Sequence, residues 1–371
     1  MSRSLRIAYF AHSLRSDWNN GNAHFLRGLM REIAAIGHDV QVFEPESGWS
    51  IENLLQEPCG QSSIAQFKGR YPDLQIRTYA ADAIGKRETW RELLRDVDVV
   101  IVHEWNPPLL ANNLLEIRSE LKYRMFFHDT HHRASSSPEQ IRLFGVDRFD
   151  GVVVFGEVLR KIYCDRFGMK CVWTLHEAAD TSVFKPQRAA IKRQDVVWIG
   201  NWGDDERSAE IREFLLRPAE GMRDRKFTFY GVRYPAEARL ALGAAGVHYG
   251  GYLPNLQAPR RYAESKVTVH VPRQQYAKQM PGIPTIRVFE TLACGIPLVS
   301  AQWLDTEELF RKDDFIFVGD CGEMRKALTR LLNAPEEAAG LAERGLETVL
   351  QRHTCAHRAA QLSEICEEVL R

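Results

Sequence analysis

Short apolar runs alternate with segments of helical spacing along most of the 371-residue sequence, in two successive series. In the first series, runs at 5–11 and 40–43 flank a helical pattern at 23–36 that ends at Gly37. This arrangement predicts a strand, helix, strand unit with a parallel, right-handed crossover. Further strands are expected at 97–102, 125–127 and 151–155. The alternation predicts a doubly wound parallel sheet.

The pattern changes around 172–180, which we interpret as a linker that closes at Phe184-Lys185-Pro186. A second series of strands is expected at 196–199, 227–230, 247–249, 267–271, 296–300 and 315–318, with helices beginning near 208, 236, 256, 285 and 323. A final helix is expected at 353–370, after an interruption near Arg352.

The predicted fold class is therefore α/β, with two doubly wound Rossmann-like domains facing each other across a cleft. The first domain is expected to comprise 1–178, completed by the C-terminal helix 353–371. The second is expected to comprise 187–352, with a linker near 179–186. A chain of this length exceeds the size at which single hydrophobic cores usually stop growing.

Charge and cysteine content narrow the class of protein. Lys+Arg and Asp+Glu both number 49, so the formal net charge of +0 gives no global attraction to nucleic acid or anionic lipid. The apolar run at 5–11 is too short for a signal peptide or a membrane span. The 7 cysteines are scattered without CxxC spacing, which fits reduced thiols and argues against a zinc site. We expect a cytoplasmic protein that binds no nucleic acid and has no transmembrane segment.

In the first domain, polar residues follow the expected strands, where open parallel sheets bind ligands. Asn20-Gly21-Asn22 precede the first helix, so backbone could approach a ligand there, although a surface turn explains Gly21 equally well. His128 and Asp129 end a strand and favour catalysis or polar-substrate binding, and His103 extends the same rim. The histidine spacing here matches no known metal pattern, so no metal ligand is expected.

In the second domain, Gly200 and Asn201 begin a glycine-rich loop ahead of a helix, with Arg207 nearby. The backbone N–H groups of such a loop could receive a diphosphate, although any tight turn would use the same glycines. Tyr230 and Tyr252 lie at two strand ends and are candidates either for a wall against a nucleotide base or for the core.

The segment Gly282-Ile283-Pro284-Thr285-Ile286-Arg287-Val288-Phe289-Glu290 carries two charges among apolar residues. Thr285 and Ile286 fall at the expected helix start, which places Arg287 in the first turn and Glu290 on the same side one turn later. A basic residue beside a helix N-terminus is unfavourable unless an anion binds there, and a carboxylate one turn on could accept two hydrogen bonds from a ribose diol. An exposed Arg–Glu surface pair is the competing interpretation.

The stretch from Arg287 to Pro297 resembles the donor-site signature R-x-F-E-A-x-A-C-G-x-P of GT-B glycosyltransferases, in the "glycosyl transferases group 1" type. Further similar segments occur in the expected order: Gly37-His38-Asp39-Val40, Ala179-Asp180 with Phe184-Lys185-Pro186, and His353-Thr354-Cys355-Ala356-His357-Arg358, the last resembling the CgeB-like branch. Two features depart from the larger group. Its E-x7-E pattern has an acidic residue where this chain has Gly282, and the loop 200–206 is acidic, with Asp204 and Asp205, where the group has Arg and Lys.

The resemblance implies transfer of a sugar, of the hexosyltransferase type, from a nucleotide-diphosphate-sugar co-substrate to an unidentified acceptor (protein, polysaccharide, lipid or metabolite), with retention and without a metal or other cofactor. It implies catalytic roles for His128, Asp129 and Arg287, donor binding by the second-domain residues named above, and acceptor binding by Asn20, Gly21, Asn22 and His103. Two alternatives remain at this point. One is a nucleotide-sugar epimerase of the same fold, and the other is a relative that binds nucleotide-sugar or a partner without catalysis.

Overall fold

The computed structural model describes residues 3–188, 191–203 and 206–371, and the chain forms two compact units. Unit 1 contains residues 1–177 and 355–371, and unit 2 contains residues 178–354. Unit 1 is built on a seven-stranded sheet of order β3-β2-β1-β4-β5-β6-β7, in which all the pairings are parallel. Its strands are β1 Arg6–Phe10, β2 Asp39–Pro45, β3 Ile76–Tyr79, β4 Val99–His103, β5 Arg124–Asp129, β6 Gly151–Val154 and β7 Val172–Thr174.

Unit 2 is built on a six-stranded parallel sheet of order β10-β9-β8-β11-β12-β13. Its strands are β8 Gln194–Ile199, β9 Phe227–Tyr230, β10 His248–Tyr249, β11 Ser265–His270, β12 Leu298–Ala301 and β13 Ile316–Val318. Apolar residues of the central strands, among them Val196, Trp198, Phe229 and Val267, form its core with the covering helices.

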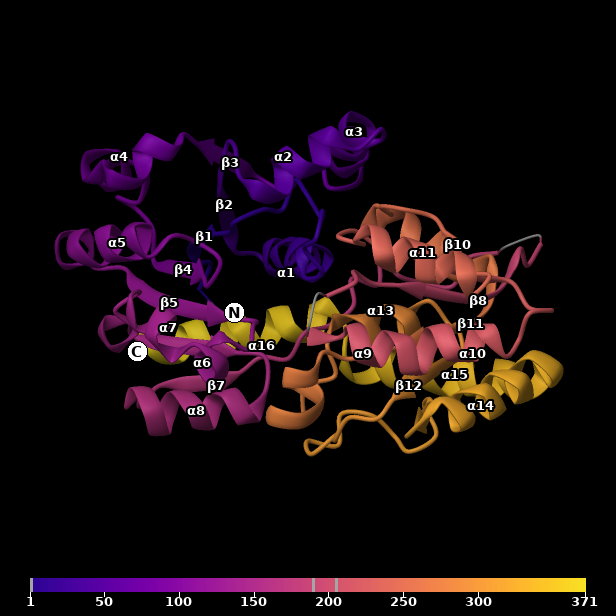
Figure 1. The fold of residues 1–371 in the computed structure, drawn as a ribbon. Coiled ribbons are helices and arrows are strands. Elements are labelled where there is room, and N and C mark those ends of the chain that lie inside the picture. Colours follow the sequence, from indigo (N-terminus) through magenta and orange to yellow (C-terminus); the bar gives the residue numbers. More distant parts are fainter. Residues whose placement is uncertain (1–2, 189–190, 204–205) are drawn as a thin grey trace. The chain divides into compact units, whose positions relative to one another are not determined.

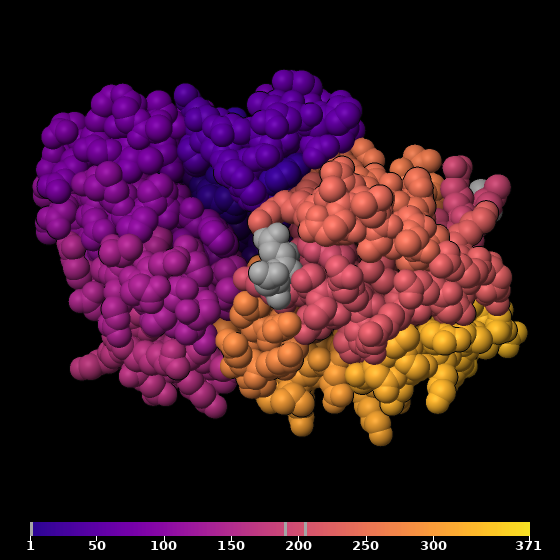
Figure 2. Space-filling view, viewed as in Figure 1, coloured from indigo at the N-terminus to yellow at the C-terminus, as the bar shows by residue number. Residues whose placement is uncertain are grey.

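The helices follow the strands along the chain (Figure 1). In unit 1 they are α1 Ala23–Ala35, α2 Trp49–Gln56, α3 Gly60–Arg70, α4 Arg87–Leu93, α5 Pro108–Leu121, α6 Arg133–Ser136, α7 Pro138–Arg142, α8 Glu157–Phe167 and α16 Cys355–Leu370. In unit 2 they are α9 Ser208–Ile211, α10 Arg217–Glu220, α11 Ala236–Ala244, α12 Ala258–Ala263, α13 Ile286–Ala293, α14 Cys321–Asn333 and α15 Pro335–Arg352. Figure 2 shows α14 and α15, in yellow, on the outer surface of unit 2.

Both sheets are doubly wound, as predicted. The order of the strands reverses between β1 and β4 in unit 1 and between β8 and β11 in unit 2. All five residues of β4 are buried, as expected for a central parallel strand that is covered on both faces. Gly295 ends α13 with a φ of 63°, which is the left-handed conformation anticipated at this helix terminus.

Two strands differ from the prediction, and both lie at the edges of the first sheet. Residues 172–174 were interpreted as part of a linker, but they form β7 beside β6. β3 pairs with β2 and was not anticipated, because its sequence IRTY mixes polar and apolar residues and only Tyr79 is buried. Edge strands are short and half exposed, so their hydrophobic pattern is weak.

The C-terminal helix α16 packs against α1 within unit 1. A hydrogen bond of 2.7 Å joins His38 Nε2 to Ser363 Oγ, and Gln361 donates to the carbonyl of Thr174 at 2.9 Å. Arg358 donates to the carbonyl of His176 at 2.8 Å, and burial lowers the pKa of this guanidinium to about 10. Side-chain contacts as well as apolar packing therefore attach α16 to unit 1.

Candidate functional sites in the two units

In unit 2 the strand order reverses between β8 and β11, so the residues beyond these two strands are candidates for ligand binding. Gly200 and Asn201 follow β8, and His270 ends β11. The N–H of Gly200 donates to the carbonyl of Tyr230 at 2.8 Å, and Asn201 Oδ1 accepts from the N–H of Val232 at 2.9 Å. These bonds hold the loop after β8 in a fixed conformation at the end of the sheet.

Arg287 and Glu290 form an ion pair on the first turns of α13. The Glu290 side chain is 0% exposed and that of Arg287 is 25% exposed. Asn255 Nδ2 donates to Glu290 Oε1 at 3.4 Å, and Arg287 hydrogen-bonds the buried Tyr262, whose pKa burial raises well above its ordinary value. The interpretation as an exposed surface pair is therefore wrong, because the carboxylate is completely buried.

Three arginines lie close enough to influence one another at this end of the sheet. Burial, together with the positive charges of Arg273 and Arg287, lowers the pKa of Arg207 to about 9. Arg207 lies at the N-cap of α9 with its guanidinium 5.4 Å from the ring centre of Trp198, and Arg273 pairs with Glu206 at 2.7 Å. Mutual repulsion of this kind would be relieved by a bound anion.

The start of α13 has an unusual backbone. Thr285 is its N-cap residue, with φ 60° and ψ 156°, a region that costs a β-branched residue about 1–3 kcal/mol. His270 Nε2 hydrogen-bonds Thr285 Oγ1 at 3.1 Å, and His270 Nδ1 hydrogen-bonds Ser300 Oγ at 2.9 Å. Burial and the nearby Arg207 and Arg287 lower the pKa of His270 to about 3, so it is neutral. The buried His270 therefore fixes the residue that begins the helix.

The other residues predicted in unit 2 are less clearly oriented toward a ligand. Ile286 begins α13 and has a buried side chain, so only its backbone N–H is available at the helix start. Tyr230 is buried, with Arg261 5.6 Å from its ring centre, while Tyr252 is half-buried in the loop after β10. Asp204 and Asp205 lie outside the described residues.

In unit 1 the strand order reverses between β1 and β4, and a buried polar network follows β4. His103 Nδ1 lies 2.9 Å from Glu104 Oε2, and His103 Nε2 hydrogen-bonds Thr130 Oγ1 at 3.0 Å. Asn22 Nδ2 donates to the same Thr130 oxygen at 2.8 Å, and Thr130 donates to Glu104 Oε1 at 3.4 Å. The predicted residues His103 and Asn22 thus belong to one network, together with Glu104 and Thr130, which the sequence did not single out for a role.

His128 and Asp129 end β5 beside this network. Tyr9 OH lies 2.8 Å from His128 Nδ1, and among the described residues His128 Nε2 has no hydrogen-bond partner although it is buried. Asp129 accepts a hydrogen bond of 2.7 Å from Tyr163 OH and one of 2.9 Å from the N–H of His131. One ring nitrogen of His128 is therefore fixed, while the other has no protein partner in this part of the structure.

The titratable groups of this network are strongly perturbed. Burial raises the pKa of Glu104 to about 8, and burial with the neighbouring charge of Glu104 raises the pKa of Asp129 to about 7. Burial lowers the pKa values of His103 and His12 to about 3. Carboxyls that titrate near neutral pH can hold or release a proton, and perturbed groups of this kind cluster at functional sites.

The remaining residues predicted in unit 1 lie in the loop before α1. Asn20 is buried and its Nδ2 donates to the carbonyl of Ser13 at 2.9 Å, so this amide supports the loop itself. Gly21 separates it from Asn22, the N-cap of α1.

Within the described parts of both units, no group of three or more His, Cys, Asp or Glu side chains is arranged to hold a metal ion. No helix in the described ranges is long and apolar enough to cross a membrane.

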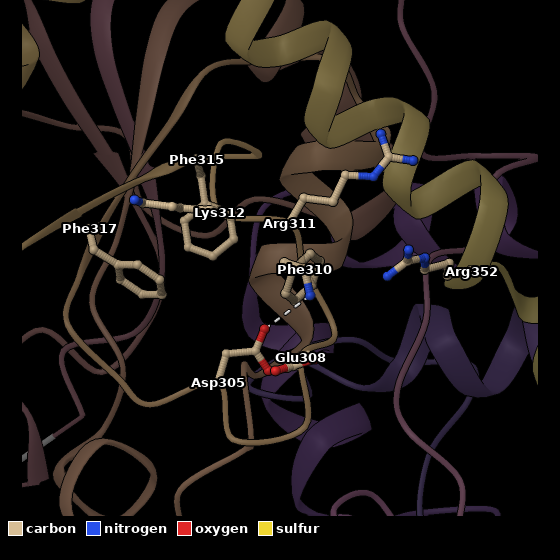
Figure 3. Close-up of a pocket in the computed structure, with 8 residues that line it drawn as sticks. All are labelled: Asp305, Glu308, Phe310, Arg311, Lys312, Phe315, Phe317 and Arg352. Carbon is tan, nitrogen blue, oxygen red and sulfur yellow. Dashed lines mark hydrogen bonds between the residues drawn. The ribbon is translucent and has the colours of Figure 1, made fainter.

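A separate cavity of about 410 Å³ lies beside β13 in unit 2 (Figure 3). Its lining is aromatic and charged: Asp305, Glu308, Phe310, Arg311, Lys312, Phe315, Phe317 and Arg352. Asp305 accepts a hydrogen bond of 3.0 Å from the N–H of Phe310, drawn as a dashed line. No residue predicted from the sequence for donor or acceptor binding lines this cavity.

Residues 207–364 match the model of a family described as glycosyl transferase-like. No curated protein matches the sequence. The structure is similar to that of a glycosyltransferase from Rickettsia africae ESF-5, with a TM-score of 0.68, 10% identity and 100% of both chains covered. It is similar to Anabaena Alr3699/HepE in complex with UDP-glucose, with a TM-score of 0.71, 12% identity, and 98% of this chain and 100% of that chain covered. Sucrose-phosphate synthase from Thermosynechococcus elongatus gives a TM-score of 0.69 at 15% identity, with 99% of both chains covered.

At these low identities the structural similarities establish the fold, so the predicted GT-B class is confirmed. The family match covers the region of unit 2 that contains Arg207, Arg287 and Glu290.

Proposed function

We propose that the protein is a glycosyltransferase that binds a nucleotide-diphosphate-sugar in unit 2 and transfers the sugar, of the hexosyl type, to an acceptor bound in unit 1. The observation that carries the proposal is the ion pair of Arg287 with the fully buried Glu290 at the start of α13, beside Arg207 and Arg273. The glycosyl transferase-like family match supports it. Structures of similar fold that contain UDP or UDP-glucose support a uridine nucleotide.

The charges in unit 2 match the chemistry of such a donor. Its diphosphate carries the negative charge that the three arginines and the N-terminus of α13 would neutralise. In the transition state the leaving diphosphate gains charge, so the same groups would stabilise it further. Three guanidinium groups can supply this stabilisation without a metal ion, and we therefore propose a metal-independent reaction. Glu290 is covered in the free protein by its pair with Arg287, so it would accept hydrogen bonds from the two ribose hydroxyls once Arg287 turns to the diphosphate and uncovers the carboxylate.

In unit 1 we propose that His128 contacts the reacting sugar through Nε2, with Tyr9 holding its Nδ1. Asp129 would hold the strand end through Tyr163 and the backbone of His131. Asn22 and His103, which both hydrogen-bond the Thr130 hydroxyl, would form the acceptor-binding site together with Asn20 and Gly21.

We further propose transfer with retention, membership of the CgeB-like branch and a cytoplasmic location. The leaving diphosphate would assist the acceptor hydroxyl, so no protein nucleophile is required.

Calorimetric titration of nucleotide diphosphates tests the donor site. We expect Glu290→Gln and Arg287→Ala to weaken nucleotide binding by about 1–3 kcal/mol, roughly 5- to 150-fold, because each removes a charged partner from a desolvated site. A matched control is Glu337→Gln, which removes the carboxylate of an exposed pair with Arg330 and should leave affinity unchanged. Wild-type affinity in both site variants would refute the assignment. Turnover of the donor without any acceptor would instead indicate an epimerase.

A further inference from the structure

An ion pair joins the loop that follows β8 to the loop that follows β11. Arg273 Nη1 donates to Glu206 Oε2 at 2.7 Å, although the two residues are 67 positions apart in the sequence. β8 and β11 are neighbouring strands, and the strand order of the sheet reverses between them. The pair therefore lies at the end of the sheet where open parallel sheets bind ligands.

A second glutamate connects the same two segments of the chain. Gln274 Nε2 donates to Glu210 Oε2 at 3.1 Å, and Lys278 Nζ lies 3.7 Å from Glu210 Oε1. These contacts do not involve the guanidinium of Arg273 or the carboxylate of Glu206. The two loops therefore remain connected when Arg273 leaves Glu206 for another partner.

The Glu206–Arg273 pair is open to solvent and lies beside other positive charges. The side chains of Arg273 and Glu206 are 28% and 34% exposed. Burial is the main cause of the lowered pKa of Arg207, and the charge of Arg273 lowers it further, whereas that of Glu206 raises it. Glu206 thus offsets part of the positive charge that the arginines bring together here.

An ion pair of this kind is easily exchanged for a stronger one. Pairs between partly exposed side chains are weak, because water screens both charges. A diphosphate carries more than one negative charge and can bind a guanidinium through two parallel hydrogen bonds, so it is a stronger partner for Arg273 than a single carboxylate is.

We propose that Glu206 competes with the diphosphate of the donor for Arg273, an inference that rests on the proposed glycosyltransferase function. In the free protein Glu206 holds Arg273 and offsets its charge. When a nucleotide-diphosphate-sugar binds, Arg273 turns from the carboxylate to the diphosphate. After transfer, Glu206 takes Arg273 back, which weakens binding of the nucleoside diphosphate and favours its release. Product release limits the turnover of many enzymes, so this exchange would bear on rate as well as affinity.

The test measures a gain in affinity, which a merely structural role of Glu206 would not produce. Calorimetry with UDP, ADP, GDP and TDP first identifies the nucleoside diphosphate that the wild type binds most tightly. We expect Glu206→Gln to bind it at least about threefold more tightly, because Arg273 no longer has to leave a carboxylate. Binding of the parent nucleoside, which has no phosphate, should be unchanged. The control Glu213→Gln removes a nearby carboxylate that pairs with Arg217, and it should bind both ligands like the wild type.

A double-mutant cycle then tests whether the gain depends on Arg273. Arg273→Gln should weaken binding of the nucleoside diphosphate, and adding Glu206→Gln to this variant should give no further gain. Stopped-flow measurements should show that the tighter binding by Glu206→Gln comes from slower release of the nucleoside diphosphate.

Unchanged affinity in Glu206→Gln would overturn this inference while leaving the nucleotide site intact. A gain of equal size in Glu213→Gln, or a gain that persists without Arg273, would overturn it as well, since either would reflect a general effect of charge. Failure of the wild type to bind any of the nucleoside diphosphates would overturn the proposed function itself, and this inference with it.

Discussion

Glu104 is buried at the end of β4, where its carboxyl contacts His103 and Thr130. Thr130 donates to Glu104 Oε1 at 3.4 Å, and His103 Nε2 can donate to the same hydroxyl. Among the described residues, Glu104 Oε2 and His103 Nδ1 have no hydrogen-bond partner, although both atoms are buried and lie 2.9 Å apart. Burial therefore disfavours the ionised form of Glu104, which has too few hydrogen bonds to compensate for the loss of water.

The raised pKa values predict how stability depends on pH. The folded protein keeps a proton on Glu104 up to about pH 8, while the unfolded chain releases it near its ordinary value of 4.5. The contribution of Glu104 to the unfolding free energy should therefore fall as pH rises from about 5 to 8, by up to about 1.4 kcal/mol per pH unit. The buried His103, His12 and His270, whose pKa values are lowered to about 3, contribute with the opposite sign below about pH 6.5. Glu104→Gln removes the Glu104 contribution, so its unfolding free energy relative to that of the wild type should rise from pH 5 to 8 when unfolding in urea is measured at several pH values.

Glu116→Gln provides the control, because Glu116 lies exposed on α5 in a surface pair with Arg148. Its slope should match that of the wild type. Asp129, whose pKa is raised to about 7, should keep part of the slope in Glu104→Gln. Parallel curves for the wild type and Glu104→Gln would show that Glu104 is ionised in the folded protein near pH 5.

The spacing of residues in the sequence predicted some residues of the two candidate sites and missed others. Arg287 and Glu290 were found because a helix fixes side chains three positions apart on one side. Arg273 was not found, since the loop that follows β11 brings it close to Arg207 and no local sequence pattern records that proximity. Glu104 adjoins the predicted His103, but its protonation depends on burial, which a sequence does not display.

At the scale of elements, the hydrophobic pattern predicted the central strands and missed those at the edges. β1, β4 and β6 consist almost wholly of buried apolar residues, so they stand out from the adjacent loops. β3 and β7 are three or four residues long and partly exposed. Their pairing is determined by the neighbouring strand, which is a tertiary effect that outweighs local preference.

The packing of α16 gives a second prediction at this scale. Leu362 is 2% exposed, so Leu362→Ala should lower the stability of unit 1 by about 2–5 kcal/mol through loss of apolar contacts and creation of a cavity. Glu364→Ala, on the exposed side of the same helix, should change stability by less than about 0.5 kcal/mol. Scanning calorimetry measures both. A normal melting profile for Leu362→Ala would mean that α16 adds little to unit 1.

At the scale of the whole molecule, each unit has its own sheet and its own core. We therefore expect two calorimetric transitions, one of which is shifted downward by Leu362→Ala. A nucleotide at about 100 times its dissociation constant should stabilise the other transition by about 2.7 kcal/mol, because only unit 2 is proposed to bind it. An equal shift of both transitions would indicate that the units unfold together or that unit 1 also contributes to nucleotide binding.

Unit 1 is interrupted in the sequence by the whole of unit 2, since α16 follows residue 354. A ribosome therefore delivers residues 178–354 before the helix that packs on α1, which at roughly 5–20 residues per second takes on the order of ten seconds or more. During that interval unit 2 can fold, whereas α1 still lacks its partner helix. Unit 1 is therefore begun first and completed last. Until α16 emerges, the apolar surface that it covers on α1 is exposed on the nascent chain, so this interval is the period in which the protein most needs a chaperone.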